Sequence, residues 1–167
     1  MPSLRSKILS FMLVHNDFFT PKSKRLTRIE NAQDILRFRE MVKISAEKFG
    51  KPDKSLSIEI IDEKNFYAEW LRPKNSPKDK GILYFHGGGL VSGSAKSHRG
   101  IVSKFVKTTG IQALTFDYAL APENPFPAGL NDALKAYEYL LNHGFKSQNI
   151  IFMGDSGGGN LLLALLL

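Results

Sequence analysis

The feature that most constrains the fold is a regular alternation of apolar runs and helical patterns in the second half of the sequence. Three continuous apolar runs alternate with two segments of helical periodicity, in the order 82–85, 97–109, 111–116, 128–142 and 149–153. Strands that are apolar at every position are buried on both faces of a sheet, and the helices between them cover those faces. The alternation therefore predicts an α/β fold with a mostly parallel sheet and right-handed crossovers.

The first half of the sequence follows a different pattern. Two segments with apolar side chains at helical spacing precede two short β-rich runs, over residues 3–15, 32–49, 56–61 and 65–71. The polar residues Asp62 to Lys64 join the two β-rich runs, which predicts an antiparallel hairpin. Because a helix with an apolar stripe must bury it, we expect each N-terminal helix to cover another part of the protein.

The composition excludes several classes of protein. Hydrophobic residues make up 43% of the 167 residues, which excludes wholesale disorder. The absence of cysteine excludes disulfide scaffolds, cysteine zinc sites and cysteine nucleophiles. The net charge of +7 comes mainly from residues 1–80, which hold 17 Lys or Arg and 11 Asp or Glu, against 6 and 5 in residues 81–167.

The basic excess is densest in a cluster formed by Lys22, Lys24, Arg25 and Arg28. Such clusters can follow phosphates, but no nucleic-acid-binding module surrounds this one, and we expect no nucleic-acid partner. Two interpretations remain open: a solvated loop, or a weak contact with a membrane surface, anionic lipid or an acidic protein. The apolar run near the N-terminus is shorter than the ~18 residues of a spanning helix and precedes no cleavage site, so we expect a cytoplasmic protein, with a secretory signal as the alternative.

The most specific motif is the turn after the last apolar run. Residues 154–159 read Gly-Asp-Ser-Gly-Gly-Gly, which places Ser156 in a G-x-S-x-G nucleophile elbow between a strand and a helix. The sharp turn holds the serine in a strained conformation with its hydroxyl exposed, and a Cβ at Gly154 or Gly158 would collide with a neighbouring strand or helix. The helix directs its free N–H groups at the reacting oxygen, so the N–H of Gly157 is a candidate oxyanion donor.

A second glycine motif, His86-Gly87-Gly88-Gly89, directly follows the apolar run 82–85. N–H groups of consecutive glycines can converge on one oxygen because no side chain blocks the approach, and an oxyanion hole requires this convergence. We interpret His86 as a residue that orders the loop, because in hydrolases with such an elbow the catalytic base follows the nucleophile in the chain.

Each glycine motif taken alone also occurs in phosphate-binding turns. A P-loop requires Gly-Lys followed by Ser or Thr, and no lysine follows Gly158. A dinucleotide site requires an acidic residue at a later strand end, which neither turn has at the required spacing. The two motifs together, in this order and on these elements, therefore indicate an acyl-transfer site, and they imply no metal and no organic cofactor.

These residues resemble a known family, the bacterial hormone-sensitive-lipase-like branch of the α/β-hydrolases. The likeness lies in three stretches, of which the proline-rich middle one is the most diagnostic: His86–Gly89, Asp117–Ala128 and Gly154–Asn160. The resemblance implies a three-layer α/β-hydrolase core, of which residues 53–167 form the N-terminal part, and an N-terminal helical cap over residues 1–52. It also implies an esterase or lipase that hydrolyses carboxylic esters. The aromatic residues Phe11, Phe18 and Phe19 of the N-terminal segment suggest apolar, short- to medium-chain acyl groups.

The same resemblance assigns roles to individual residues. Ser156 is the nucleophile, and three glycines supply oxyanion N–H groups, namely Gly87, Gly88 and Gly157. Five further residues support the motifs, with the aspartate stabilising the turn: His86, Gly89, Gly154, Asp155 and Gly158. The sequence has a different residue from the usual Arg, His and Ala of the family at three positions, namely Ala119, Asn124 and Gly157. A backbone donor survives the last change.

The residues after Ser156 contain no candidate for the rest of a catalytic triad. In the family's chain order, Ser is followed by Asp or Glu and then by His. Residues 157–167 contain no Asp, Glu or His. We interpret the earlier His98 and His143 as a pocket-lining residue and a helix cap. The apolar C-terminal segment suggests a truncated chain, so we expect the last strands and the triad Asp and His to be missing. Without them the isolated chain should be nearly inactive. We also expect its unpaired sheet edge to favour a partner, an oligomer or aggregation.

Two alternatives to this esterase remain open. One is a catalytically silent remnant that binds an apolar ligand or a partner protein through the same groove. The other is an amide or lactone hydrolase on the same scaffold.

Overall fold

The computed structural model describes residues 4, 7–8, 10–11 and 29–167. The chain separates into two compact units, residues 1–34 and 35–167. The few described residues near the N-terminus are helical. The rest of the helix expected over 3–15 lies outside the described residues, as does the basic cluster between Lys22 and Arg28. The division into a cap over 1–52 and a catalytic part over 53–167 stays a prediction.

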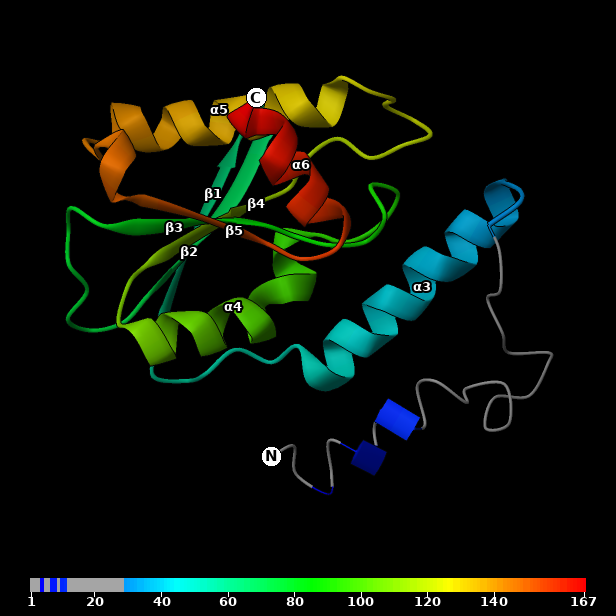
Figure 1. Ribbon diagram of the computed structural model, residues 1–167, viewed down its shortest axis with the longest axis horizontal. Coiled ribbons are helices and arrows are strands. Elements are labelled where there is room, and N and C mark those ends of the chain that lie inside the picture. The colour runs from blue at the N-terminus through cyan, green and yellow to red at the C-terminus, as the bar shows by residue number, and fades with distance from the viewer. Residues whose placement is uncertain (1–3, 5–6, 9, 12–28) are drawn as a thin grey trace. The chain divides into compact units, whose positions relative to one another are not determined.

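The elements of the second half alternate as the sequence predicts (Figure 1). In chain order, the elements are α3 (Ala32–Phe49), β1 (Ser57–Glu63), β2 (Phe66–Arg72), β3 (Gly81–Phe85), α4 (Ala95–Thr109), β4 (Ala113–Phe116), α5 (Ala128–Asn142), the 3-10 helix η2 (Ser147–Asn149), β5 (Ile150–Gly154) and α6 (Gly157–Leu166).

The five strands form one sheet in the order β1-β2-β4-β3-β5. β1 and β2 form the expected antiparallel hairpin, and β2 runs antiparallel to β4. β3 is parallel to β4 on one side and to β5 on the other. The apolar alternation therefore predicted the parallel part correctly, while the sheet as a whole is mixed because the hairpin extends it.

Among the element boundaries that differ from the sequence expectation, two have a clear local reason. α4 begins two residues early because Ser94 and Ser97 form a capping box, in which each side chain bonds the backbone of the other residue. β4 begins two residues late because the N–H of Gln112 donates to the Ser76 hydroxyl at 2.9 Å instead of joining the ladder with β2.

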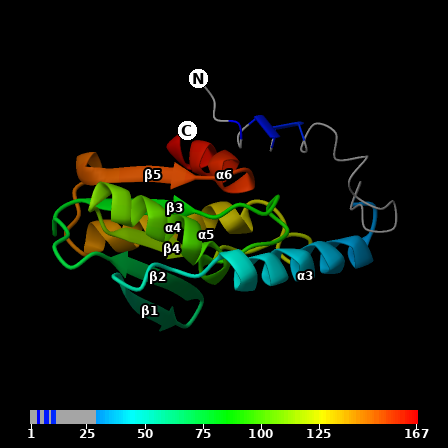
Figure 2. The same cartoon turned by 90° about the horizontal axis from the view of Figure 1, so that it is seen from below.

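Helices cover both faces of the sheet and produce three layers. α5 and α6 lie on one face and α4 lies on the other, as the two views in Figure 1 and Figure 2 show. The side chains of β3 alternate between the two faces: Leu83 and Phe85 pack with α5 and α6, whereas Ile82 and Tyr84 pack with α4. This double burial explains why the strand is apolar at every position.

The core on the α5 and α6 face is apolar and rich in aromatic rings. Trp70, Phe85 and Phe116 are each at most 1% exposed there. Trp70 stacks on Phe145 with 5.5 Å between ring centroids, and Phe85 meets Phe116 edge to face at 5.3 Å. Buried apolar area and aromatic contacts of this kind stabilise the fold without any charged group.

The core on the α4 face contains buried polar groups. Glu69 in β2 is fully buried, and its carboxylate accepts hydrogen bonds of 2.5 and 2.7 Å from the Arg99 guanidinium on α4. The Tyr67 hydroxyl donates to the same carboxylate at 2.6 Å. Burial and the neighbouring Glu69 raise the Tyr67 pKa to about 12, so this hydroxyl remains a donor. At the helix N-terminus, Asp117 accepts from the N–H of Ala95 at 2.6 Å.

One edge of the sheet and the helix beside it expose apolar side chains. β5 is an edge strand on which Ile151 is 45% exposed, and Leu163 and Leu166 on α6 are each 62% exposed. Such surfaces favour association, so oligomerisation or a protein partner stays a prediction. Within the part of the chain that the structure describes, no helix combines the length and apolar character needed to cross a membrane. The expected cytoplasmic location stays a prediction as well.

Candidate active site

The two glycine motifs lie at the carboxyl ends of adjacent strands. The direction in which strands are added to the sheet reverses at β3, and in such sheets ligands bind in the crevice outside these strand ends. Phe85, the last residue of β3, is paired with Gly154, the last residue of β5. The loop that begins at His86 and the turn that holds Ser156 therefore start side by side.

Ser156 adopts the strained backbone that its motif predicts. Its φ of 50° and ψ of −122° fall where non-glycine residues rarely occur, and such a conformation costs about 1–3 kcal/mol. The residue is exposed at the N-terminus of α6, and its side chain makes no capping hydrogen bond. The turn can approach β3 closely because a Cβ on Gly158 would lie only 2.2 Å from the Phe85 carbonyl oxygen.

Asp155, next to the serine, connects the elbow to the other glycine motif. Its Oδ1 accepts hydrogen bonds of 2.9 Å from the Tyr84 hydroxyl and of 2.9 Å from the Gly87 N–H. The Nε2 of His98 lies 3.6 Å from the same oxygen. Burial and the neighbouring Asp155 carboxylate raise the Tyr84 pKa, so its hydroxyl keeps the proton that it donates. These contacts fit the structural role expected for Asp155.

The bond to Asp155 changes the set of available oxyanion donors. The sequence interpretation assigns Gly87 as a donor, but its N–H already donates to a carboxylate, which holds a donor more strongly than a neutral oxygen does. The N–H groups of Gly88 and Gly89 have no hydrogen-bond acceptor among the described residues. The difference arises because the register of β3 and β5, which brings Asp155 against Gly87, is a tertiary feature.

The free amides of the two motifs lie close together. An ideal Cβ on Gly157 would lie 3.0 Å from the amide nitrogen of Leu90 and 3.1 Å from that of Gly89. Gly157 opens α6, so its own N–H has no acceptor within the helix. The amide nitrogens of Gly89 and Leu90 thus lie close to the residue that follows Ser156, and an oxyanion hole requires donors from both segments at such close range.

His86 lies beneath the loop rather than at its surface. The residue is fully buried, its Nδ1 lies 3.0 Å from the Gly87 carbonyl oxygen, and its ring stacks on Tyr118 at 4.1 Å between centroids. The Tyr118 hydroxyl donates to the His86 carbonyl oxygen at 2.7 Å. Burial lowers the His86 pKa to about 4, so the imidazole is neutral at pH 7. These contacts agree with a residue that orders the loop.

The other described histidines have hydrogen-bond partners other than Ser156. The His98 ring is bound within the first turn of α4, with Nδ1 at 2.9 Å from the Ser97 hydroxyl. His143 caps α5, and its Nδ1 lies 2.8 Å from the Tyr139 carbonyl oxygen. Within the described ranges, no histidine makes a hydrogen bond to Ser156.

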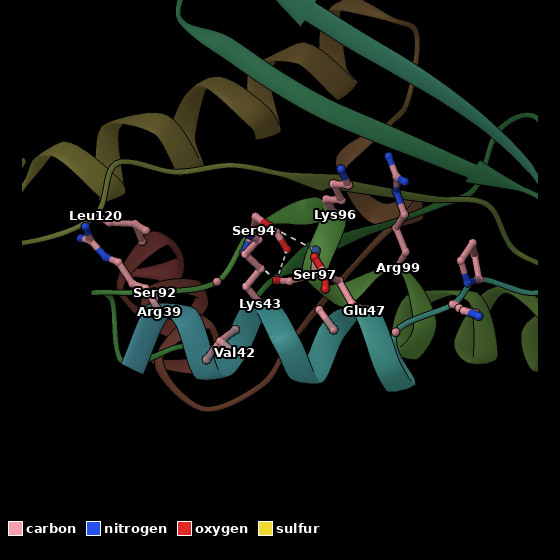
Figure 3. Close-up of a pocket in the computed structure, with 15 residues that line it drawn as sticks. Arg39, Val42, Lys43, Glu47, Ser92, Ser94, Lys96, Ser97, Arg99 and Leu120 are labelled. Atoms are coloured by element: carbon pink, nitrogen blue, oxygen red, sulfur yellow. Dashed lines mark hydrogen bonds between the residues drawn. The ribbon is translucent and has the colours of Figure 1, made fainter. Parts of the chain in front are cut away.

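A cavity of about 470 Å³ lies between α3 and the segment that follows the oxyanion motif. Figure 3 shows Arg39 and Val42 on one wall and Ser94 and Leu120 opposite them. Ser156 is not among the residues that line this cavity. The cavity is therefore separate from the Ser156 hydroxyl. Part of its wall is formed by residues that follow the 86–89 motif in the chain, namely Ser92, Gly93 and Ser94.

Sequence reasoning did not identify three residues that contact the glycine motifs or the segments beside them: Tyr84, Tyr118 and Arg39. A weak signal was present for the tyrosines, because each places a hydroxyl at or just after the end of a buried strand. Arg39 gave no signal, because it lies on a helix with several other charged residues and its acceptors are 52 to 84 positions away in the chain.

Comparison with known proteins identifies relatives of this chain. A family with the α/β-hydrolase fold matches residues 82–167. Human hormone-sensitive lipase is 37% identical over 97 residues, which are 55% of this chain and 9% of the lipase. The acetyl-hydrolase of Streptomyces hygroscopicus is 39% identical over 99 residues, which are 59% of this chain and 33% of that enzyme. The crystal structure of EstE5 soaked with p-nitrophenyl butyrate has a TM-score of 0.78 and 34% identity, and the match covers 95% of this chain and 51% of EstE5.

The matched residues include both glycine motifs and every element from β3 to α6. The chain belongs to the hormone-sensitive-lipase-like branch of the α/β-hydrolases. It spans about half the length of the solved structure and less of the two curated relatives.

Proposed function

We propose that this chain carries the nucleophile and the oxyanion donors of a carboxylic ester hydrolase. The observation that carries the proposal is the approach of the Gly89 and Leu90 amide nitrogens to within 3.0–3.1 Å of the Cβ position of Gly157. Donors from two motifs thereby lie beside a strained, exposed serine. Membership of a family of esterases and lipases supports the same chemistry.

In the proposed reaction, the Ser156 Oγ attacks the carbonyl carbon of the ester and loses its proton to a general base. The carbonyl oxygen becomes an oxyanion that accepts hydrogen bonds from the N–H groups of Gly88, Gly89 and Gly157. The intermediate collapses to an acyl-serine as the alcohol leaves with a proton, and water then hydrolyses the acyl-serine to the free acid. Each donor lost from an oxyanion hole costs about 100- to 1,000-fold in rate.

The acid and the base of the triad are proposed to come from outside residues 1–167. No Asp, Glu or His follows Ser156 in this sequence, and its hydroxyl makes no capping hydrogen bond. A serine without a base is a poor nucleophile, and removal of the triad histidine from a serine protease lowers turnover about a million-fold. The isolated chain is therefore expected to be nearly inactive.

We propose apolar acyl groups of short to medium length as the preferred substrates. EstE5, which shares the fold at 34% identity, has been soaked with p-nitrophenyl butyrate, an ester of that size. A series of p-nitrophenyl esters with two to twelve acyl carbons would test this preference once a base is supplied.

The decisive experiment is acylation of Ser156 by p-nitrophenyl butyrate, with imidazole added as an external base and the acylated peptide identified by mass spectrometry. We expect a butyryl group on Ser156, formed faster with imidazole, and none on that peptide in Ser156→Ala. Ser147→Ala, which removes an exposed serine before β5, is the matched control and should acylate normally. Absence of acylation at Ser156 under all conditions would contradict the proposal and favour a silent binding module.

A further inference from the structure

A single side chain on α3 joins three points of the loops around the oxyanion motif. The Arg39 Nε donates to the Val91 carbonyl oxygen at 2.7 Å, and its Nη2 donates to the Ala121 carbonyl oxygen at 3.1 Å. The Nη1 and Nη2 groups bond the two carboxylate oxygens of Glu123 at 2.8 and 2.7 Å. Figure 3 shows this side chain reaching from α3 toward Leu120.

The two carbonyl groups that Arg39 contacts belong to segments that already bond one another beside the oxyanion loop, residues 86–91. The Ala121 N–H donates to the Leu90 carbonyl oxygen at 2.9 Å, and the Val91 N–H donates to the Gly88 carbonyl oxygen at 3.2 Å. Within the loop, Leu90 has a positive φ of 61°. A strained backbone persists only when its surroundings hold it, and the guanidinium binds the loop at its end.

The chemistry of the site matches a guanidinium and no other side chain. Arginine presents its donors in a rigid planar fork, so it can bond two carbonyls and a carboxylate simultaneously, whereas lysine offers one point charge. The Arg39 side chain is 27% exposed, which leaves these bonds partly shielded from water. Pairing with Arg39 lowers the Glu123 pKa to about 2, so the carboxylate is charged at neutral pH.

We propose that Arg39 is a positioning residue for the oxyanion loop. Through its hydrogen bonds, the position of α3 determines where the Gly88 and Gly89 amides lie. The proposal rests on the proposed esterase function for its catalytic consequence, but its structural part can be measured without any reaction. An oxyanion donor acts only within about 2.7–3.1 Å of the developing charge, so a small displacement of the loop removes most of its effect.

The structural test measures amide hydrogen exchange and ¹H–¹⁵N spectra of the full 167-residue chain labelled with ¹⁵N-glycine. In Arg39→Gln we expect exchange of the peptide covering 86–91 to accelerate about tenfold and the Gly88 and Gly89 resonances to move. Lys43→Gln is the matched control, because Lys43 lies on the same helix and pairs only weakly, at 4.0 Å, with Glu40. It should change neither readout. Arg39→Lys should restore part of the wild-type spectrum, since one of the carbonyl bonds can re-form.

The functional test repeats the imidazole-assisted acylation of Ser156. We expect Arg39→Gln to acylate about tenfold or more slowly than wild type, and Lys43→Gln to acylate normally. If wild type is acylated and Arg39→Gln reacts equally fast, the positioning role is refuted while the esterase proposal stands. If wild type is not acylated, the esterase proposal fails, and exchange alone decides whether Arg39 holds the loop.

Two outcomes would overturn the inference directly. One is unchanged exchange of 86–91 in Arg39→Gln, and the other is acceleration of equal size in the β3 and β4 peptides, which would indicate general destabilisation. If Arg39→Gln fails to fold, exchange of the 86–91 peptide is compared between wild type and Arg39→Lys instead, because that variant keeps the positive charge on the helix.

Discussion

The two faces of the sheet are held together by different interactions. The α5 and α6 face consists of apolar and aromatic side chains, whereas the α4 face contains the buried Glu69–Arg99 pair and the Tyr84–Asp155 hydrogen bond. Tyr84, whose hydroxyl donates to Asp155 of the elbow, packs on the α4 face. We infer that the apolar face supplies most of the stability and that the polar face fixes positions, because polar contacts contribute little net energy yet cost much when broken singly.

The largest expected effect tests the apolar face. Trp70→Ala should lower the free energy of unfolding by about 3–5 kcal/mol, because it leaves a large cavity beside Phe145. Urea unfolding followed by far-ultraviolet circular dichroism measures the change. Trp70→Phe, which retains an aromatic ring, is the control and should lose less. A loss below about 1 kcal/mol in Trp70→Ala would contradict the inference that the apolar face supplies most of the stability.

The second prediction concerns the buried ion pair on the polar face. Glu69→Gln should destabilise the chain by about 3 kcal/mol, because the Arg99 charge then remains in place without its partner. The double variant Glu69→Leu with Arg99→Met should recover part of that loss, since neither charge then remains. The same denaturant experiment measures both. A double variant that is less stable than Glu69→Gln would show that the pair itself supplies net stability.

The third prediction uses pH to examine the residue beneath the oxyanion loop. Burial lowers the folded-state pKa of His86 to about 4, whereas an unfolded histidine has a pKa of about 6.5. Below pH 6.5 the unfolded chain therefore binds a proton that the folded chain excludes. Stability should fall by about 2–3 kcal/mol as the pH drops from 6.5 to 4 and then level off for this group. Asp117, whose pKa burial raises, offsets part of the loss.

Unfolding measured at several pH values separates this contribution from the others. His86→Asn should flatten the stability profile between pH 6.5 and 4. Because pairing lowers the Glu123 pKa from 4.5 to about 2, the contribution of this carboxylate to stability begins to fall only near pH 4.5, at the acid end of this window. Equal profiles in wild type and His86→Asn would contradict the assignment.

The smallest expected effect concerns the elbow itself. Ser156→Gly should raise stability by about 1 kcal/mol, because glycine tolerates a φ of 50° and relieves strain that exceeds its own entropic cost. Ser147→Gly, in the 3-10 helix before β5, is the control and should lower stability by a few tenths to about 1 kcal/mol. A Ser156→Gly chain that is less stable than wild type would indicate that the serine side chain stabilises the fold.

The sequence alone was sufficient for much of this description and insufficient at identifiable points. The apolar runs predicted the parallel strands, and the spacing around Ser156 predicted both the elbow and its strain. The engagement of Gly87 by Asp155 was not predictable, because it depends on the pairing of Phe85 with Gly154 across the sheet. The Arg39 contacts were equally hidden, since helical periodicity does not specify which distant carbonyls a charged side chain meets.

Trp70 has a practical consequence for anyone who studies this chain in solution. It is the single tryptophan of the sequence, enclosed against Phe145 with the Arg72 guanidinium 4.5 Å from its ring centre. Intrinsic fluorescence therefore reports mainly on one layer of the protein. A loosening confined to α4 or to the turn at Ser156 would leave the emission wavelength almost unchanged. Fluorescence melting curves of the unmodified chain can therefore look intact after the strand ends around Ser156 have already loosened.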